Sequence, residues 1–548
     1  MRTSSTVAAL FLGGALLPGA AFAQTALDRV APATQRPSEQ PEPTAPQPRV
    51  AIDVDAPSGT AAGGATILAG AIGIAGLQAL SPADFADIIA NHVGKTLAPD
   101  QLASLATAIA ERARSRGYVF ASAWIEPQRL SNGVLTVCID EGRVDEIRFG
   151  GPEQPAVRRA LAPLINGKPA RLEEVERRLL IAGDVDGVRM GKTRFLRESG
   201  KGVLLVNATQ DRLAARVALS NEGSKPIGPE QLRIDVDVNA LFSSDDAFTV
   251  TYSTTPGEPS ELQYGRLRYA NRVSASGTEV ALVASGSTAK PGAYLEPFDL
   301  ESRSWFLGAE LLHPLWRRRD ASLWLQAELG VRDLQQWRRS VRVRHDRIAT
   351  ARVSLYGYSD VAGGRLRIST TLSQGLGVLG ATGRNDPLAS RYDADATFTA
   401  LSAWSEWTTD LGGQFSLRLA MQSQLASQPL LISEETGLGG TGFLRGYDWS
   451  ERSGDQGVMG MAELRYLWNR PFGLVRRAQL YAFVDGGHVS NLDNGFGSGS
   501  LASTGGGLRT DITADTGANL EFAVPLSGAR YDTDDQTPKI NFRLIRSF

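Results

Sequence analysis

Hydrophobic and polar residues alternate over most of the chain from residue 213 to the C-terminus. The alternation is clear in segments 232–239, 248–253, 323–329 and 415–422, where apolar side chains take every second position and polar or charged ones lie between them. Because successive side chains of a strand point to opposite faces, this pattern predicts many β-strands. It is typical of a soluble β-sandwich as well as of a transmembrane barrel, so alternation alone leaves both folds open.

Features elsewhere in the chain favour the barrel. Residues 1–23 carry Arg2, an apolar run over residues 7–17 and Ala21-Phe22-Ala23, the layout of a cleavable secretory signal. An uncleaved anchor is the alternative, but the apolar run is short for a bilayer span. The last strand pattern ends on Phe548. Since backbone groups in lipid must all be paired, residues 213–548 are expected to close into a barrel of about sixteen antiparallel strands.

The N-terminal half follows a different pattern. Residues 24–64 are rich in Pro, Gln, Ala and Thr and are expected to form a linker. The uncharged stretch 56–83 is long enough for a membrane helix, but its many glycines favour a strand with flexible flanks. Residues 65–142 then show a β segment, two helices and two strands, the last two joined at Ser131-Asn132-Gly133, and residues 143–212 repeat this order. The chain is therefore expected to carry two tandem β-α-α-β-β modules before the barrel.

Composition excludes several classes of function. The 57 basic and 59 acidic residues nearly balance, which gives no electrostatic reason to expect a nucleic-acid partner. Cys138 is the single cysteine, and the four histidines lack metal-ligand spacing, so neither a disulfide nor a metal site is expected. The chain has no GxxxxGK[ST] loop, and we expect no nucleotide and no other cofactor.

Two motifs in the barrel segment stand out as a pair. Leu444-Arg445-Gly446-Tyr447 lies in a glycine-rich loop, and Phe483-Val484-Asp485-Gly486-Gly487 lies at a strand end. If Val484 faces lipid, Phe483 and Asp485 face the lumen, where a carboxylate needs water or a cation and a guanidinium suits it well. A loop folded back into the lumen and held by Arg445 and Asp485 is one interpretation. A solvated outer loop carrying Arg445, with Asp485 facing water, is the other.

These patterns together resemble a known family. The module order, with Arg116-Gly117-Tyr118 and Glu141-Gly142, resembles POTRA domains, the periplasmic modules of outer-membrane protein-transporting barrels. With the two barrel motifs, nearly all of the chain from residue 65 onward resembles the two-partner secretion transporters of the outer-membrane insertase superfamily. The resemblance implies an outer-membrane barrel with POTRA domains in the periplasm, which binds a secreted haemolysin or adhesin and exports it.

The resemblance also implies specific residue roles. It implies a lumenal lock between Arg445 and Asp485, with Gly446, Tyr447, Leu444, Phe483 and Gly487 around it. Two departures from the family pattern are visible. Ser220 stands where an aspartate is usual, and residues 24–35 are too short and proline-bounded for a convincing plug helix.

Three rival functions predict other features. An insertase of outer-membrane proteins commonly has five POTRA modules, whereas two are expected here. A diffusion porin leaves residues 65–212 unexplained. A barrel enzyme needs a nucleophile and base or paired carboxylates, for which His345 and His488 are the only histidine candidates, and a histidine at a strand end is more often simply solvated. We therefore expect a transporter and not an enzyme.

Overall fold

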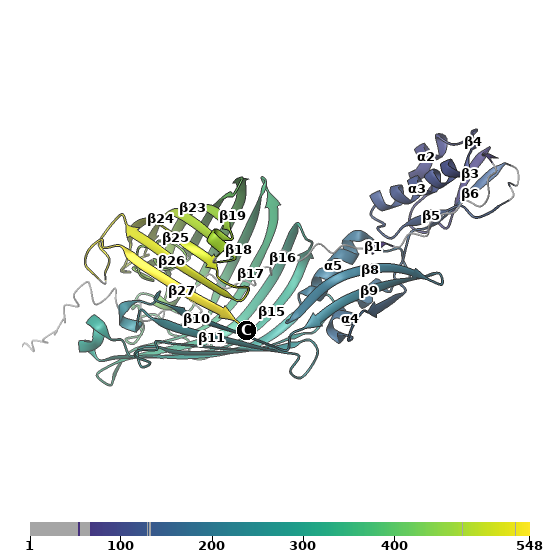
Figure 1. Ribbon diagram of the computed structural model, residues 1–548. Helices are drawn as coiled ribbons and strands as arrows, with labels where there is room; N and C mark the ends of the chain where they lie inside the picture. The colour runs from purple at the N-terminus through teal and green to yellow at the C-terminus, as the bar shows by residue number, and fades with distance from the viewer. Residues whose placement is uncertain (1–52, 55–65, 129, 131–132, 474, 532) are drawn as a thin grey trace, which may run out of the picture.

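The computed structural model describes residues 53–548 except 55–65, 129, 131–132, 474 and 532. Two small α+β units and one large barrel follow each other along the chain, and the C-terminus lies at the side of the barrel that faces the small units (Figure 1). The predicted signal peptide, the possible plug helix at residues 24–35, most of the linker and the turn at 131–132 fall outside the described residues.

The first unit packs helices against a small sheet. Its elements are β2 Ile67–Leu68, β3 Ala71–Ala75, the 3₁₀ helix η1 Pro82–Phe85, α2 Ala86–Ala90, β4 Thr96–Leu97, α3 Pro99–Ser115, β5 Ser122–Trp124 and β6 Val134–Asp140. The three-stranded sheet has the order β3-β6-β5. Ser81 and Asp84 form a capping box before α2, and Phe85 lies in the core.

One predicted strand of this unit is much shorter than its sequence pattern. The alternation predicts a strand over residues 118–126, whereas β5 covers only Ser122–Trp124. After Gly117, which has a φ of 97°, the Tyr118 amide still bonds the Ala113 carbonyl and the Ala121 amide bonds the Tyr118 carbonyl. The chain therefore leaves α3 through a compact turn before it becomes extended.

The second unit repeats the order strand, two helices, two strands. Its elements are β7 Glu146–Phe149, α4 Pro155–Leu161, η2 Ala162–Leu164, α5 Leu172–Gly183, β8 Val188–Glu198 and β9 Lys201–Gln210. The sheet order is β1-β8-β9-β7, because β1 Asp53–Val54 from the N-terminal segment pairs in parallel with β8. One edge of this sheet is thus covered by the chain's own N-terminal segment.

The two units share core residues. Phe120 of the first unit stacks on Phe195 of β8 with ring centroids 3.9 Å apart, and both rings are fully buried. Arg197 donates to the Phe120 carbonyl at 2.7 Å and pairs with Asp140 at 3.0 Å. These contacts make the joint between the units a packed interface.

The barrel closes from sixteen antiparallel strands, which confirms the predicted fold class and strand number. The strands are β10 Leu213–Ser220, β11 Gln231–Asn239, β12 Asp246–Thr254, β13 Gln263–Arg272, β14 Glu279–Ala289, β15 Leu300–Arg317, β16 Ala321–Arg338, β17 Val341–Val361, β18 Gly364–Leu376, β19 Thr399–Gly412, β20 Phe415–Ala426, β23 Gln456–Asn469, β24 Arg477–Ser490, β25 Gly499–Asp511, β26 Thr516–Pro525 and β27 Lys539–Ser547. Pairing of β10 with β27, from Arg216 opposite Ser547 to Ser220 opposite Arg543, closes the sheet.

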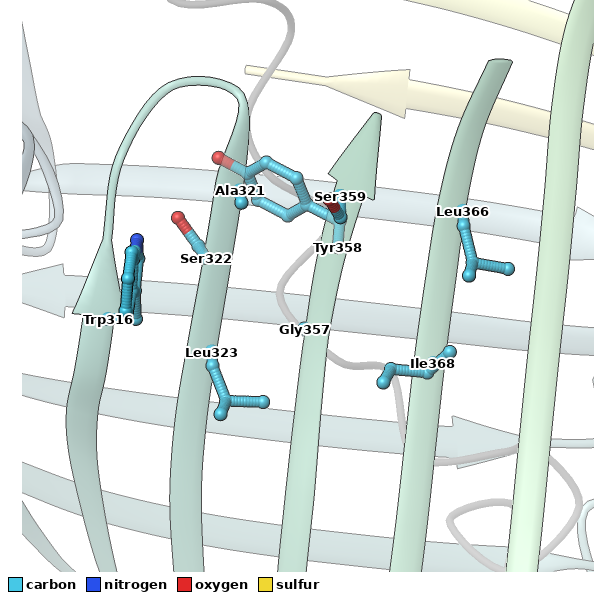
Figure 2. Close-up of a pocket in the computed structure, with 9 residues that line it drawn as sticks. All are labelled: Trp316, Ala321, Ser322, Leu323, Gly357, Tyr358, Ser359, Leu366 and Ile368. Atoms are coloured by element: carbon cyan, nitrogen blue, oxygen red, sulfur yellow. The ribbon is translucent and has the colours of Figure 1, made fainter. Parts of the chain in front are cut away.

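The outer wall of the barrel is apolar, as the alternation predicts. Leu329, Val353 and Leu372 point outward and are about half exposed. Near the end of the barrel next to the second unit, Trp316, Leu323, Gly357 and Ile368 line a shallow apolar depression across β15 to β18 (Figure 2). The four named residues belong mostly to the outer wall, which faces lipid in a membrane barrel.

The second unit docks on the turns at one end of the barrel. Arg317, at the end of β15, holds Asp184 through two bonds of 2.7 and 2.8 Å. Arg178 of α5 donates to the Ala275 carbonyl at 3.1 Å, and Arg159 pairs with Asp245 at 2.9 Å. Three separate inter-strand turns therefore contact this unit, and they lie together at one end of the barrel.

Among the described residues, no helix has the length and hydropathy required to span a membrane.

Candidate functional site: a hairpin locked inside the lumen

The loop between β20 and β23, residues 427–455, folds back against the inner wall. Within it, η5 Ile432–Glu434 is followed by β21 Thr436–Leu438, and β21 pairs with β22 Arg452–Gly454 to form a two-stranded ribbon. The segment between these two strands carries the Leu444-Arg445-Gly446-Tyr447 motif, and all four residues are buried. We call residues 427–455 the lumenal hairpin and residues 443–447 its tip.

Arg445 lies at the centre of the site with only 3% of its surface exposed. Its Nη1 atom donates to Glu463 Oε2 at 2.8 Å and to Glu521 Oε2 at 3.2 Å. Its Nε atom and its backbone amide each donate to Asp485 Oδ2 at 3.3 Å. The structure thus brings together the predicted pair, but the guanidinium contacts three carboxylates from β23, β24 and β26. The short bond to Glu463 marks the stronger contact.

Aromatic rings of β24 support the guanidinium. The Arg445 Cζ atom lies 3.3 Å from the centroid of the Phe483 ring. Phe483 is buried and faces the lumen, whereas its neighbours Ala482 and Val484 are exposed on the outer wall, as their alternation predicts. A guanidinium stacked on a ring keeps its edge free for hydrogen bonds, which lets Arg445 bind carboxylates in the plane of the fork.

Asp485 also binds the residues beside Arg445. Its Oδ1 atom accepts a hydrogen bond from the Ser503 hydroxyl on β25, and Ser503 Oγ accepts the Gly446 amide at 3.2 Å. Asp485 therefore organises the backbone of the tip as well as the arginine side chain. Both of its oxygens have donors, which a buried carboxylate requires.

Two glycines let the hairpin approach the wall closely. A Cβ atom at Gly446 would lie 2.9 Å from the Ser503 Cβ and 3.0 Å from the Pro525 nitrogen. A Cβ atom at Gly487 would lie 2.9 Å from both Leu438 of the ribbon and Met459 of β23. A Cβ atom at either position would force neighbouring atoms to shift, which glycine avoids.

The other residues of the tip fill the remaining space. Leu444 adopts a φ of 58° and is fully buried together with Tyr447. The Tyr447 hydroxyl donates to the Ser527 carbonyl in the loop between β26 and β27. Of the seven residues predicted for the site, the structure places Leu444, Arg445, Gly446, Tyr447, Phe483 and Asp485 at the tip contact, and Gly487 under the ribbon.

Sequence reasoning missed Glu463 and Glu521. Glu463 is fully buried and also binds Arg465 at 2.6 Å and Arg509 at 2.8 Å. A signal for it was present, because Glu463 and Arg465 follow the apolar Met459 and Met461 on the same face of β23, and Glu463 lies directly opposite Phe483 in the sheet. Placing Glu463 next to Phe483 requires the register between β23 and β24, which the sequence alone does not supply.

The lumenal hairpin also contacts a second part of the barrel wall, away from the tip. Glu434 accepts two bonds from Arg352 Nη2 on β17, at 2.8 and 2.9 Å, and Arg352 further binds Glu328 on β16 at 3.0 Å. In the barrel, β17 lies four strands from β23. The hairpin is therefore tied to two separate parts of the barrel wall.

The two histidines considered for an enzyme have structural contacts. His345 Nε2 lies 2.9 Å from Asp333, which also binds Arg347. His488 is exposed, and its Nδ1 atom lies 2.9 Å from the Ser500 hydroxyl. Within the described part of the chain, no group of three or more His, Cys, Asp or Glu side chains is arranged to hold a metal ion.

The chain is similar to known outer-membrane transporters in sequence and in fold. The chain is 24% identical to the heme/hemopexin transporter protein HuxB of Haemophilus influenzae over 460 residues, which cover 81% of this chain and 80% of HuxB. It is 24% identical to the outer membrane transporter CdiB of Escherichia coli over 518 residues, 88% of this chain and 80% of that protein. The solved structure of E. coli CdiB superposes with a TM-score of 0.70, at 20% identity over 97% of this chain and 99% of that one.

Two family models match the sequence directly. Residues 70–142 match the POTRA domain of ShlB type, which confirms the predicted identity of the first module. Residues 200–510 match the haemolysin secretion/activation protein family ShlB/FhaC/HecB. That match covers more than half of the chain, and the protein therefore belongs to this family of outer-membrane transporters, whose POTRA domains lie in the periplasm.

Proposed function

We propose that this protein exports one large secreted partner through its barrel lumen, and that the lumenal hairpin is the gate of that route. The observation that carries the proposal is the buried Arg445, held by Asp485, Glu463 and Glu521. Burying a charged side chain among three acids costs desolvation free energy, and such a cluster is best explained if it stabilises one defined conformation of the loop. We infer that this state is the closed pore.

The periplasmic units would receive the partner before it enters the lumen. The first unit has β3 and β5 at the edges of its sheet, and an extended segment could add to such an edge through backbone hydrogen bonds. We propose that residues 143–212 act as a second POTRA domain, because they repeat the order strand, two helices, two strands. Because residues 143–212 dock on the barrel turns, a partner bound to the two units would lie at the periplasmic opening of the barrel.

Opening of the pore requires the tip of the lumenal hairpin to move away from its contacts on the barrel wall. Moving Arg445 away separates it from three carboxylates, so the partner must supply interactions that replace these contacts or shift the population of an unlocked state. No nucleotide-binding motif is present in the sequence, and we propose that folding of the partner outside the cell drives net export. We propose a partner of haemolysin or adhesin type; the family description names a haemolysin.

Substitution of the lock residues tests the proposal. Arg445→Ala and Asp485→Ala should release the tip from the closed state, so that basal conductance in planar bilayers rises and export of a co-expressed partner is disturbed, while the amount of heat-modifiable barrel in the outer membrane stays normal. Arg303→Ala is a matched control, because the Arg303 side chain is 61% exposed, forms an ion pair with its neighbour Glu301 on the same strand and lies over the Trp337 ring of β16. Unchanged conductance together with unchanged export in both lock variants would rule out the gating role. The partner for this export assay is a large secreted β-helical protein whose gene lies next to the gene for this protein.

A further inference from the structure

Outside the tip contact, a second buried arginine lies where three loops meet at the extracellular end of the barrel. Arg391, in the loop between β18 and β19, is 8% exposed. Its Nη1 atom donates to Asp455 Oδ1 at 2.7 Å and to Glu435 Oε1 at 3.1 Å. The Asp455 and Glu435 side chains are 0% and 2% exposed. A guanidinium is thus enclosed with two fully buried acids.

The two acids have a specific place in the lumenal hairpin. Glu435 directly precedes β21 and Asp455 directly follows β22, so they flank the two sides of the ribbon where it leaves the wall. We call Glu435, Asp455 and Arg391 the neck cluster. A single guanidinium therefore binds both sides of the neck, at the opposite end of the hairpin from Arg445.

The remaining contacts of the cluster bring in a third loop. Arg391 Nη2 donates to the Leu492 carbonyl at 3.0 Å, and Asp455 Oδ2 accepts the Leu492 amide at 2.7 Å. Asp455 Oδ1 also accepts the Leu430 amide at 2.7 Å, and Asp393 binds the other edge of the guanidinium at 3.2 and 3.3 Å. The loops 377–398, 427–455 and 491–498 are therefore tied together through Arg391 and Asp455.

We propose that Arg391 is a positioning residue that holds the neck of the lumenal hairpin, independently of the lock at its tip. The geometry carries this inference, because both carboxylates of the neck face the same guanidinium and are otherwise buried next to each other. Without Arg391, the two buried carboxylates would lose the guanidinium that they share, and their mutual repulsion would favour separation of the two sides of the neck. The hairpin could then move as a whole, even with an intact tip. The inference rests on the proposed role of the hairpin as a gate.

The loop provides its own control residue. Arg384 belongs to the same loop as Arg391 and pairs with Asp493 of the same neighbouring loop, but at 3.7 Å and with both side chains more than half exposed. An exposed pair of this kind contributes little. Arg391→Gln and Arg384→Gln therefore remove the same charge from the same pair of loops, and only the first disrupts the neck.

The test measures opening without any partner. In planar bilayers, Arg391→Gln should raise the ratio of open to closed time by roughly tenfold or more, because loss of a buried charge-assisted contact shifts a two-state equilibrium at least that far. Arg384→Gln should match the unmodified protein. Heat-modifiability confirms that each barrel is folded, and Glu435→Gln, which removes only one arm of the cluster, gives a second and milder variant. Equal opening in Arg391→Gln and Arg384→Gln would overturn the proposal.

A labelling experiment reports on the neck itself. Thr436→Cys places a thiol at a buried position of β21, in a Cys138→Ser background without other thiols. In intact cells, a membrane-impermeant maleimide should label this thiol roughly tenfold faster when Arg391 is replaced by Gln than when Arg384 is. Equal labelling rates would contradict the proposal. Because neither readout involves export, a negative result here leaves the transport function standing, and a failure of export would leave the neck measurement valid.

Discussion

At the scale of single residues, the site depends on matching one guanidinium to several acceptors. Arg445 binds Asp485 through Nε and Glu463 and Glu521 through Nη1, and a lysine, whose donors all sit on one nitrogen, does not offer this planar fork. The sequence motifs predict Arg445 and Asp485. They do not predict the two glutamates, because these contacts depend on strand register and on the path of a long loop, and neither leaves a local sequence signal.

Gly446 gives the sharpest test at this scale. Gly446→Ala would place a Cβ atom 2.9 Å from Ser503 and 3.0 Å from the Pro525 nitrogen, so the tip can no longer seat fully. Overpacking of this kind costs typically ~1–3 kcal/mol, which shifts the closed state toward open by roughly tenfold. We expect higher basal conductance in planar bilayers.

Gly442→Ala is the matched control, because the space around a Cβ atom there is open. It lies in the same glycine-rich loop and should leave conductance unchanged. If the two alanine variants conducted alike, close seating of the tip would not be what closes the pore.

At the scale of elements, helical and strand periods in the sequence predicted the secondary structure well where an element has one clear apolar face. Helix α3 buries Leu102, Leu105 and Ile109 as its spacing predicts. The shortened β5 and the pairing of β1 with β8 were not predictable. The first depends on turn hydrogen bonds after Gly117, and the second is a contact between segments about 140 residues apart.

Asp186, in the connection between α5 and β8, makes the docked second unit sensitive to pH. Burial, followed by repulsion from Glu279, raises the pKa of Asp186 to about 6. A carboxyl whose folded pKa lies above its unfolded value contributes stability at low pH, and that stability is lost as pH rises from about 4 to about 6. Asp186→Asn should therefore raise the apparent unfolding temperature of the purified protein at pH 7.5 and change it little at pH 4.5.

The control for this prediction is Asp211→Asn, since the Asp211 side chain is 44% exposed and pairs with the exposed Arg189. It should have only a small effect at either pH. An equal rise in unfolding temperature from Asp186→Asn at both pH values would show that ionisation of the buried carboxyl is not the cause.

At the scale of the whole molecule, the two periplasmic units and the barrel are linked by packed and ionic contacts. Phe120 stacks within the core of the second unit, and Arg317 binds Asp184 at the barrel mouth. Alternation and family resemblance predicted the sixteen-stranded barrel behind its periplasmic units. The contacts between the units and the barrel could not be predicted from the sequence, because no periodic pattern of residues marks an interface between domains.

Deleting residues 65–142 should abolish export and leave a heat-modifiable barrel in the outer membrane. The deletion also removes Phe120 from the core of the second unit, so its effect has two sources. Phe120→Ala in the full chain measures the second source alone and should reduce export only in part. Export that persists after the deletion would contradict a docking role for the first unit, and complete loss in Phe120→Ala would assign the effect to packing.

The central claim is that the partner passes through the lumen. A photoreactive amino acid at Gln326, on the inward face of β16, can be compared with one at the adjacent Leu325, on the lipid-facing side. With a partner stalled during export by a folded C-terminal fusion, our account predicts a crosslink to the partner from position 326 and none from position 325. A crosslink from position 325 alone, or from neither position while the stalled partner is exposed at the cell surface, would contradict it.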